Sequence, residues 1–274
     1  MKIKLLLFVT IFVITAVAVS FGQQKKRVLI YTKNGKGYVH DNIATSVKTL
    51  QKICAQNNIE TDVSDDPSVF TRENLSRYSA VIFSNSNNEG FDNDAQRLAF
   101  MHYIQAGGSF MGIHSACASE RQWPWFWAMV GGKFKRHAKL QKFDIKVIDP
   151  THPSTDFLGD VWHWEDECYF QNNLNPDIHV LLAADLRTVE DDKLKEYPGD
   201  VFGHYFPLAW YHEFDGGHQF FTALGHKIEY YSDPNFIKHL TGGLLWVVSK
   251  NRKLDYSKAT ATKIELVPKE KKEE

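Results

Sequence analysis

Short apolar runs and amphipathic stretches alternate through the first half of the chain. Four runs rich in β-branched residues predict strands at residues 27–32, 59–63, 80–84 and 109–113. Between them, apolar positions recur at helical spacing over residues 43–54, and a second helix is predicted from the capping Asp92 to Gly107. Strands that alternate with helices favour an α/β fold with a mostly parallel sheet covered on both faces. Such sheets bind ligands beside the carboxyl ends of their strands.

The second half of the chain has a different pattern. Apolar runs predict strands at residues 143–148, 178–183, 208–212 and 219–223, joined by long polar loops. Asp233 and Pro234 are typical of a helix start, and the following helix would share one apolar face among Phe236, Leu240, Leu244 and Val247. Beyond Asn251 the chain is strongly charged. We therefore expect one domain over residues 23–252 and a disordered tail over residues 253–274.

Residues 1–22 have the pattern of a secretory signal peptide. Two lysines precede an apolar run over residues 5–18, and Ser20 and Gly22 have the spacing of a cleavage site. The alternative is a retained membrane anchor, but a spanning helix needs about 20 apolar residues and this run stops short. We therefore expect a secreted or periplasmic protein with no membrane attachment after signal cleavage.

Composition narrows the function classes only in part. The formal net charge is −1, which gives no reason to expect nucleic acid or an acidic membrane surface as a partner. The three cysteines, Cys54, Cys117 and Cys168, are too few and too far apart for a disulfide framework. One pair could form outside the cytoplasm, but we expect each to be a buried free thiol.

The strongest candidate for chemistry is a histidine at a sharp turn. Residues 112–116 read Gly-Ile-His-Ser-Ala at the end of a predicted strand. The small residues Gly112 and Ala116 allow the turn to close, as in a nucleophile elbow, and this places His114 above the end of the sheet. A histidine there can be a general base, a proton donor or a metal ligand. We assign His114 as a catalytic residue.

Two further side chains are expected near His114. His40 follows the first strand, and the carboxyl ends of parallel strands lie at the same edge of a sheet. Glu167 lies in the segment Trp162–Tyr169, where three carboxylates stand among aromatic residues. Apolar rings disfavour the charged form of a carboxylate, which is how a general acid is made. We assign Glu167 to catalysis and His40 to substrate binding.

Three more histidines are included in the predicted site. His212 and His226 follow two apolar runs that are consecutive along the chain, so the two side chains could converge, and His137 lies in a loop. We assign His212 to catalysis, and His137 and His226 to substrate binding. Histidine with glutamate is compatible with a divalent metal, but the spacing is not diagnostic. The metal ligands therefore stay open.

Aromatic residues make up 14% of the chain, with seven Trp. Trp125 stands in the run Trp-Pro-Trp-Phe-Trp after the elbow, and Trp210 stands beside Tyr211 and His212. Aromatic faces stack on the apolar side of a sugar ring, and they also pack against one another in a core. We assign both tryptophans to substrate binding, with core packing as the alternative.

At these motifs the chain resembles the ThuA-like, or trehalose utilisation, family. The matching segments follow the family's order over about residues 27–249. They are Gly-Ile-His-Ser-Ala at 112–116, Trp-Pro-Trp at 123–125, Val-Gly-Gly-x-Phe at 130–134 with His137, His-Pro-Ser-Thr at 152–155, Asp-Glu-Cys-Tyr at 166–169, Ala-Trp-Tyr-His-Glu-Phe-Asp-Gly-Gly at 209–217 and Leu-Gly-His at 224–226.

The resemblance implies a flavodoxin-like fold similar to class I glutamine amidotransferases, a three-layer sandwich with a mostly parallel sheet. It also implies a role in carbohydrate utilisation, and secreted members are often labelled glycosyl hydrolases. Glutamine hydrolysis is not expected, because it needs a thiolate at the elbow. This chain has His114 there, and Cys117 is expected inside the following helix.

Three functional hypotheses follow. The leading one is an enzyme that uses a histidine-rich cleft on a small saccharide or keto-sugar, by glycosidic cleavage or by proton abstraction beside a sugar carbonyl. Glycoside hydrolysis usually needs two carboxylates, and only Glu167 stands in a suitable place. The alternatives are a non-catalytic sugar-binding protein and a metal-dependent hydrolase. No cofactor is assigned apart from the divalent metal of the last hypothesis.

Overall fold

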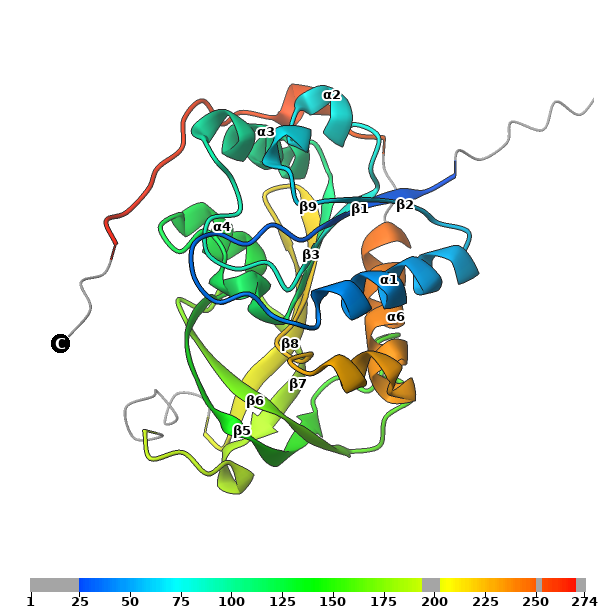
Figure 1. Cartoon of the computed structure of the whole chain (residues 1–274), viewed down its shortest axis with the longest axis vertical. Coiled ribbons are helices and arrows are strands. Elements are labelled where there is room, and N and C mark those ends of the chain that lie inside the picture. Colours follow the sequence, from blue (N-terminus) through cyan, green and yellow to red (C-terminus); the bar gives the residue numbers. More distant parts are fainter. Residues whose placement is uncertain (1–24, 194–202, 250–252, 270–274) are drawn as a thin grey trace, which may run out of the picture.

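The computed structural model describes residues 25–193, 203–249 and 253–269. The predicted signal peptide at residues 1–22 lies outside these ranges and stays a prediction. One sheet runs through the described part of the chain, with nine strands in the order β2-β1-β3-β4-β9-β8-β7-β5-β6 (Figure 1). Among the described residues, no helix combines the length and apolar character that a bilayer span requires.

The first five strands of that order form a parallel half. They are β1 (Arg27–Tyr31), β2 (Glu60–Ser64), β3 (Ala80–Ser84), β4 (Ser109–Ile113) and β9 (Gly217–Thr222). Figure 1 shows α1 (Ile43–Gln56) and α6 (Pro234–Ser249) on one side of the sheet. The other side carries α3 (Asp94–Gln105) and α4 (Pro124–Val130), with the short α2 (Arg72–Leu75) next to α3. The strands and helices predicted for this half are confirmed. The inner strands β1, β3 and β4 are buried and largely apolar, as covered parallel strands are, whereas the edge strand β2 is half-buried.

The other four strands pair antiparallel. They are β5 (Lys133–Val147), β6 (Val161–Asn172), β7 (His179–Asp185) and β8 (Tyr205–Phe214). Among the described residues, four neighbouring pairs of strands are parallel and four are antiparallel. The fold is therefore α/β with a mixed sheet, and the expectation of a mostly parallel sheet is not confirmed.

The long ribbon of β5 and β6 is the main difference from the expected elements. The sequence pattern predicted only the end of β5 and left β6 as part of a polar loop. Yet Trp162 and Trp164 are buried and alternate with the exposed His163 and half-buried Glu165, which is the period of a strand. The polar His163 and the three carboxylates that follow Trp164 obscured that period.

The expected disordered tail spans residues 253–274, of which residues 270–274 lie outside the described residues; over residues 253–269 the segment differs from that expectation. Residues 253–269 cross α3 in an extended path (Figure 1). The backbone N–H groups of Thr260 and Ala261 donate to Gln105 Oε1 at 3.0 and 3.1 Å, and the N–H of Val267 donates to the Gln122 carbonyl at 2.8 Å. The high charge of the segment reflects an exposed face rather than the loss of structure.

The three cysteines are free and buried, as expected. Two buried histidines make stability depend on pH. Burial lowers the pKa of both His152 and His239 to about 4. His239 lies on α6, and its Nδ1–H donates to the Ser154 carbonyl at 3.0 Å. Both imidazoles are therefore neutral in the folded chain at neutral pH.

These histidines predict a loss of stability in mild acid. Between about pH 6.5 and pH 4 the unfolded chain binds protons that the folded chain excludes, so the free energy of unfolding falls as the pH falls. His239→Gln keeps a donor for the Ser154 carbonyl but cannot titrate. We expect its urea-unfolding free energy to fall less steeply over this range, by up to about 1.4 kcal/mol per pH unit. The exposed control His204→Gln should follow the wild type, and an unchanged slope in His239→Gln contradicts the prediction.

Candidate functional site

The candidate site is built around the elbow that follows β4. His114 has a φ of 53° and begins a 3-10 helix, His114–Ala118. A side chain added at Gly112 would lie 3.0 Å from the Phe221 ring and 3.2 Å from the Ala116 Cβ. The elbow therefore needs the small residues that the sequence has there, as expected. Cys117 lies inside this short 3-10 helix.

The orientation of the His114 ring is fixed by two partners. Nδ1 lies 2.7 Å from the Ala223 carbonyl, which accepts only, so Nδ1 carries the proton. Nε2 is then an acceptor, and the Tyr169 hydroxyl donates to it at 3.0 Å. The Nε2 lone pair faces the candidate site, and the ring is fully buried.

Four side chains from distant parts of the chain meet at this lone pair. His40, His114, Glu167 and His226 each offer one ligand atom, and these atoms all lie within 4.8 Å of one another. His226 Nδ1 lies 3.2 Å from Glu167 Oε2 and 3.4 Å from His114 Nε2, and His114 Nε2 lies 3.8 Å from Glu167 Oε2. We call these four residues the His–Glu centre.

Each member of the centre comes from a segment that the fold brings to one edge of the sheet. His40 lies in the loop after β1, and its Nδ1 is 3.2 Å from Ser115 Oγ in the elbow. His226 follows β9, the strand that pairs parallel with β4. Glu167 comes from β6, and it lies two residues from Tyr169, so both side chains leave the same face of that strand.

A buried carboxylate holds β6 against the turn that carries His226. Asp166 is fully buried, and Gly225 N donates to its Oδ2 at 2.8 Å and His226 N to its Oδ1 at 3.4 Å. The indole of Trp164 and the N–H of Glu167 complete its donors. Burial still raises the pKa of Asp166 to about 6.

The same turn is held from its other side by an amide. Asn42 is fully buried before α1, and its Nδ2 donates to the carbonyls of Gly225 and His226, both at 2.7 Å. It also lies 3.2 Å from the Asn85 Oδ1. The backbone of Gly225 and His226 is thus held through its two N–H groups by Asp166 and through its two carbonyls by Asn42.

Burial and mutual contact set the protonation of the centre. Burial lowers the pKa of His40 to about 4 and holds the pKa of His114 well below its usual value. Glu167 and His226 act as a coupled pair. The hydrogen bond to Glu167 raises the pKa of His226. Burial of Glu167 acts to raise the pKa of its carboxyl, but the nearby imidazoles of His226, His137 and His40 together outweigh it, so that pKa is lowered. The centre therefore offers two neutral imidazoles and one carboxylate at neutral pH.

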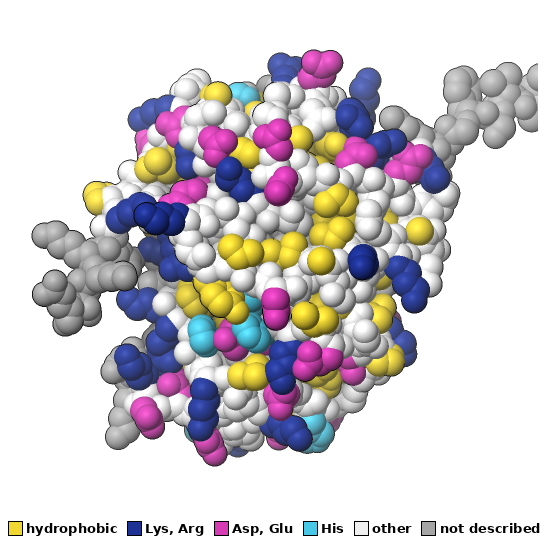
Figure 2. All heavy atoms as spheres, in the orientation of Figure 1, with side chains coloured by type: hydrophobic (Ala, Val, Ile, Leu, Met, Phe, Trp, Pro, Cys, Tyr) yellow, Lys and Arg dark blue, Asp and Glu magenta, His cyan; other side chains and the backbone are white. Residues whose placement is uncertain are grey.

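The opening of the site is lined by exposed apolar and polar groups. Tyr38 and Val39 on one side are 61% and 55% exposed, and Leu140 on β5 is 39% exposed. His137 Nδ1 lies 3.5 Å from Glu167 Oε1. Figure 2 shows histidine side chains on either side of an acidic one on this face, with apolar side chains around them. A ligand that reaches the centre meets both kinds of surface.

The structure does not bring three of the predicted residues to the centre. His212 is buried on β8, beside the backbone of Ala128 and Met129, and pairs in register with Gln219. Because β8 runs antiparallel to β9, the end of β8 lies away from the end of β9 that carries His226. The assumption that the two strand ends converge was therefore wrong.

The two tryptophans are structural in this arrangement. Trp210 is fully buried, and its indole N–H donates to the Val130 carbonyl at 2.8 Å. Trp125 stacks on Trp123, and its indole N–H donates to Asp215 Oδ2 at 2.9 Å, in the turn between β8 and β9. Core and surface packing account for both residues.

The sequence model of the family described as ThuA, trehalose utilisation, matches residues 27–247. The chain belongs to the ThuA family. No curated protein matches it.

Two solved structures share the fold of this ThuA-family chain over most of their length. A ThuA-like protein from Bacteroides uniformis ATCC 8492 is 22% identical, with a TM-score of 0.67, over 84% of this chain and 94% of the other. A ThuA-like protein from Parabacteroides merdae ATCC 43184 is 18% identical, with a TM-score of 0.64, over 89% of this chain and 98% of the other. Part of a β-galactosidase from Bacillus circulans sp. alkalophilus is similar at 13% identity and a TM-score of 0.50, over 81% of this chain and 31% of that protein. At these identities the likeness shows the fold alone.

No role was predicted from the sequence for three residues around the His–Glu centre, which are Tyr169, Asp166 and Asn42. Tyr169 could have been found from its spacing of two residues from Glu167, once residues 161–172 were recognised as a strand. Asp166 was noticed, but its role was not, because nothing in a sequence shows that a carboxylate will meet the N–H groups of residues 225 and 226. Asn42 carries no signal beyond its place before a helix.

The hydrogen bonds that Asp166 accepts predict that this side chain stabilises the fold. Asp166→Asn turns an acceptor into a donor that faces the Gly225 N–H, so we expect the free energy of unfolding to fall by about 2–3 kcal/mol. Urea denaturation measures the change. Glu165→Gln is the matched control on the neighbouring position, where the ion pair with Lys227 is part-exposed and should cost under about 1 kcal/mol. Equal stability of the two variants contradicts the assigned role.

Proposed function

We propose that this ThuA-family chain is a metal-dependent enzyme of carbohydrate utilisation, with the His–Glu centre as its reaction site. The triangle formed by His114 Nε2, Glu167 Oε2 and His226 Nδ1 carries the proposal, with edges of 3.2, 3.4 and 3.8 Å. Ligand atoms about 2.0–2.1 Å from a tetrahedral zinc lie about 3.3–3.4 Å from one another. The spacing thus fits a divalent ion of the zinc type, and His40 is the fourth side chain of the group.

The surroundings of the centre also suit a metal. A histidine ligand usually donates its second ring N–H to a carbonyl or carboxylate, which fixes the tautomer. His114 does this with the Ala223 carbonyl. Two or three imidazoles with one carboxylate are ligands for zinc and other first-row metals rather than for calcium or magnesium. A bound ion would polarise a sugar carbonyl or a water molecule.

The residues around the centre would bind and orient the sugar. Burial raises the pKa of Tyr169 well above its usual value, so its hydroxyl stays a proton donor. That hydroxyl lies at the centre, 3.0 Å from His114 Nε2. Once a metal ion occupied the Nε2 lone pair, the hydroxyl would be available to donate to a sugar oxygen. Tyr38 at the opening presents an exposed ring of the kind that stacks on a sugar face. His137, beside Glu167, adds a polar contact at the same opening.

The carboxylates support carbonyl chemistry over ordinary glycoside hydrolysis. Glycosidases use two carboxyl groups that flank the bond. Asp166 is the nearest second carboxylate in sequence, but it is fully buried and occupied by backbone N–H groups. Among the described residues, Glu167 is the carboxylate that belongs to the His–Glu centre. We therefore propose a keto-sugar or a similar saccharide as substrate, with proton transfer next to its carbonyl.

Glutaminase activity has no support in this site. Burial raises the pKa of the Cys117 thiol to about 12, and its Sγ faces the His114 carbonyl at 3.5 Å. Such a thiol is not a nucleophile at neutral pH. The family's description as trehalose utilisation supports a saccharide, and the pattern of residues 1–22 supports a location outside the cytoplasm.

Metal binding tests the centre directly. After chelator treatment, the protein should bind about one equivalent of Zn²⁺ or Co²⁺, and the Co²⁺ form should show the visible absorption of a low-symmetry site. His114→Ala and Glu167→Gln should lose at least about tenfold in affinity. His102→Ala, which removes a histidine far from the centre, is the control. Binding that is unchanged in both centre variants would falsify the metal assignment.

Turnover tests the enzymatic part of the proposal. The metal-loaded protein should convert a member of a panel of disaccharides and keto-sugars, detected by mass spectrometry. Chelation, His114→Ala and Glu167→Gln should each abolish the conversion while circular dichroism shows a folded chain. Full activity in chelator contradicts metal dependence. Sugar binding that survives His114→Ala with no turnover in any form indicates a sugar-binding protein instead.

A further inference from the structure

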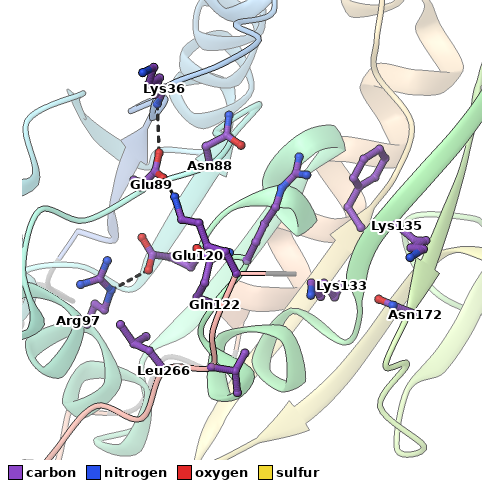
Figure 3. Close-up of a pocket in the computed structure, with 14 residues that line it drawn as sticks. Lys36, Asn88, Glu89, Arg97, Glu120, Gln122, Lys133, Lys135, Asn172 and Leu266 are labelled. Carbon is purple, nitrogen blue, oxygen red and sulfur yellow. Dashed lines mark hydrogen bonds and ion pairs between the residues drawn. The ribbon is translucent and has the colours of Figure 1, made fainter. Parts of the chain in front are cut away.

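A large cavity lies beside the His–Glu centre. Its volume is about 960 Å³, at the upper end of the range of about 300–1,000 Å³ for small-molecule sites. Figure 3 shows Lys36, Asn88 and Glu89 on one side of it, and Lys133 and Lys135 on the other. The start of β5 thus faces the loops that follow β1 and β3 across this cavity.

The wall of the cavity carries an excess of positive charge. Its two carboxylates already have partners in the protein. Glu120 is buried, pairs with Arg97 at 2.7 Å and accepts the N–H of Gly90 at 2.8 Å. Glu89 pairs with Lys269 at 3.4 Å. Lys36, Arg121 and Lys135 add positive charge that these two carboxylates do not balance.

The Arg121 side chain is fixed in position by contacts within the protein. Its Nε donates to the Ala118 carbonyl at 3.1 Å, and its guanidinium lies over the Phe134 ring, 5.4 Å from the centroid. Its Nη2 lies 3.4 Å from Asn87 Oδ1. A guanidinium has five N–H donors in a planar fork, so further donors remain for a carboxylate or phosphate. The stacking limits the freedom that binding would otherwise remove.

The cavity and the His–Glu centre share a wall. Phe134 lines the cavity, and its ring packs 4.7 Å from the ring of Tyr169, whose hydroxyl contacts His114. The ring of His137, at the opening of the centre, lies 6.2 Å from the Phe134 ring. Lys135 is two residues before His137 on β5. One extended ligand can therefore contact both places across Phe134.

We propose that this cavity binds the anionic group of a charged saccharide, a carboxylate or a phosphate, whose sugar portion reaches the His–Glu centre. The sugar portion rests on the proposed function, whereas the anion-binding cavity stands on its own charges and shape. Leu266, Val267 and Lys269 form part of the wall, so the C-terminal segment shapes this site. The segment is anchored there by the Val267 N–H bond to the Gln122 carbonyl.

Equilibrium binding tests the proposal without any need for turnover. The probes are glucuronate, glucose 6-phosphate and neutral glucose, measured by calorimetry with the full chain at low salt. We expect both anions to bind more tightly than glucose, with affinity that falls as salt is added. Preference for glucuronate or for glucose 6-phosphate identifies the anion as carboxylate or phosphate.

Charge-neutral variants assign the binding to this cavity. Arg121→Gln should weaken binding of the preferred anion about tenfold, and Lys135→Gln should weaken it by a smaller factor. Lys48→Gln removes the same charge from an exposed position on α1 and is the matched control. Lys135 is exposed, so circular dichroism and the Tm should be unchanged in Lys135→Gln. A loss of anion binding in this variant then cannot be attributed to unfolding.

Two results would overturn the proposal. One is an affinity for both anions no greater than that for glucose. The other is an anion affinity that Arg121→Gln and Lys135→Gln leave equal to that of Lys48→Gln. Neither result affects the metal and turnover tests of the His–Glu centre. If those tests fail, anion binding to this cavity can still be measured. The two proposals can therefore fail separately.

Discussion

A buried carboxylate connects the two halves of the sheet at the point where the candidate site forms. Asp166 belongs to β6, the edge strand of the antiparallel half, yet it accepts N–H groups from the turn after β9 in the centre of the sheet. A buried carboxylate is costly unless several donors satisfy it. Asp166 accepts the indole N–H of Trp164 and the backbone N–H of Glu167 from its own strand, and the backbone N–H groups of Gly225 and His226 from the turn after β9. The contact therefore forms only when β6 lies over the end of the parallel strands. Glu167 and Tyr169 reach His114 because of it.

The mixed sheet explains why the site needs such a contact. In a parallel sheet the loops at the carboxyl edge collect at one end without further help. Here β9 pairs parallel with β4 and antiparallel with β8, and the strands beyond β9 alternate in direction, so they do not all end at this edge. The elbow and the loop after β1 come from the parallel half. The antiparallel half contributes through the face of a ribbon instead of through a strand end.

The sequence predicted the parallel half and the elbow well, because these depend on local patterns. Apolar strands, helix caps and small residues around His114 each have a physical reason within a few residues of the position concerned. His40 and Glu167 were also assigned correctly to the same place as His114. His212 was not, because strand direction depends on the pairing of distant segments. Trp125 and Trp210 could not be separated from core residues, since stacking on a sugar and stacking on another ring have the same sequence pattern.

The end of β9 shows how closely structure and chemistry are coupled in this site. Ala223 supplies the carbonyl that fixes the His114 tautomer, and three residues later His226 supplies a member of the centre. The turn between them is held by Asp166 on one side and by Asn42 on the other. A shift of this turn would therefore rotate the His114 ring and displace His226 together. The relative position of His114 and His226 is thus set by one short segment, and this allows the two side chains to keep their geometry although they are 112 residues apart in the chain.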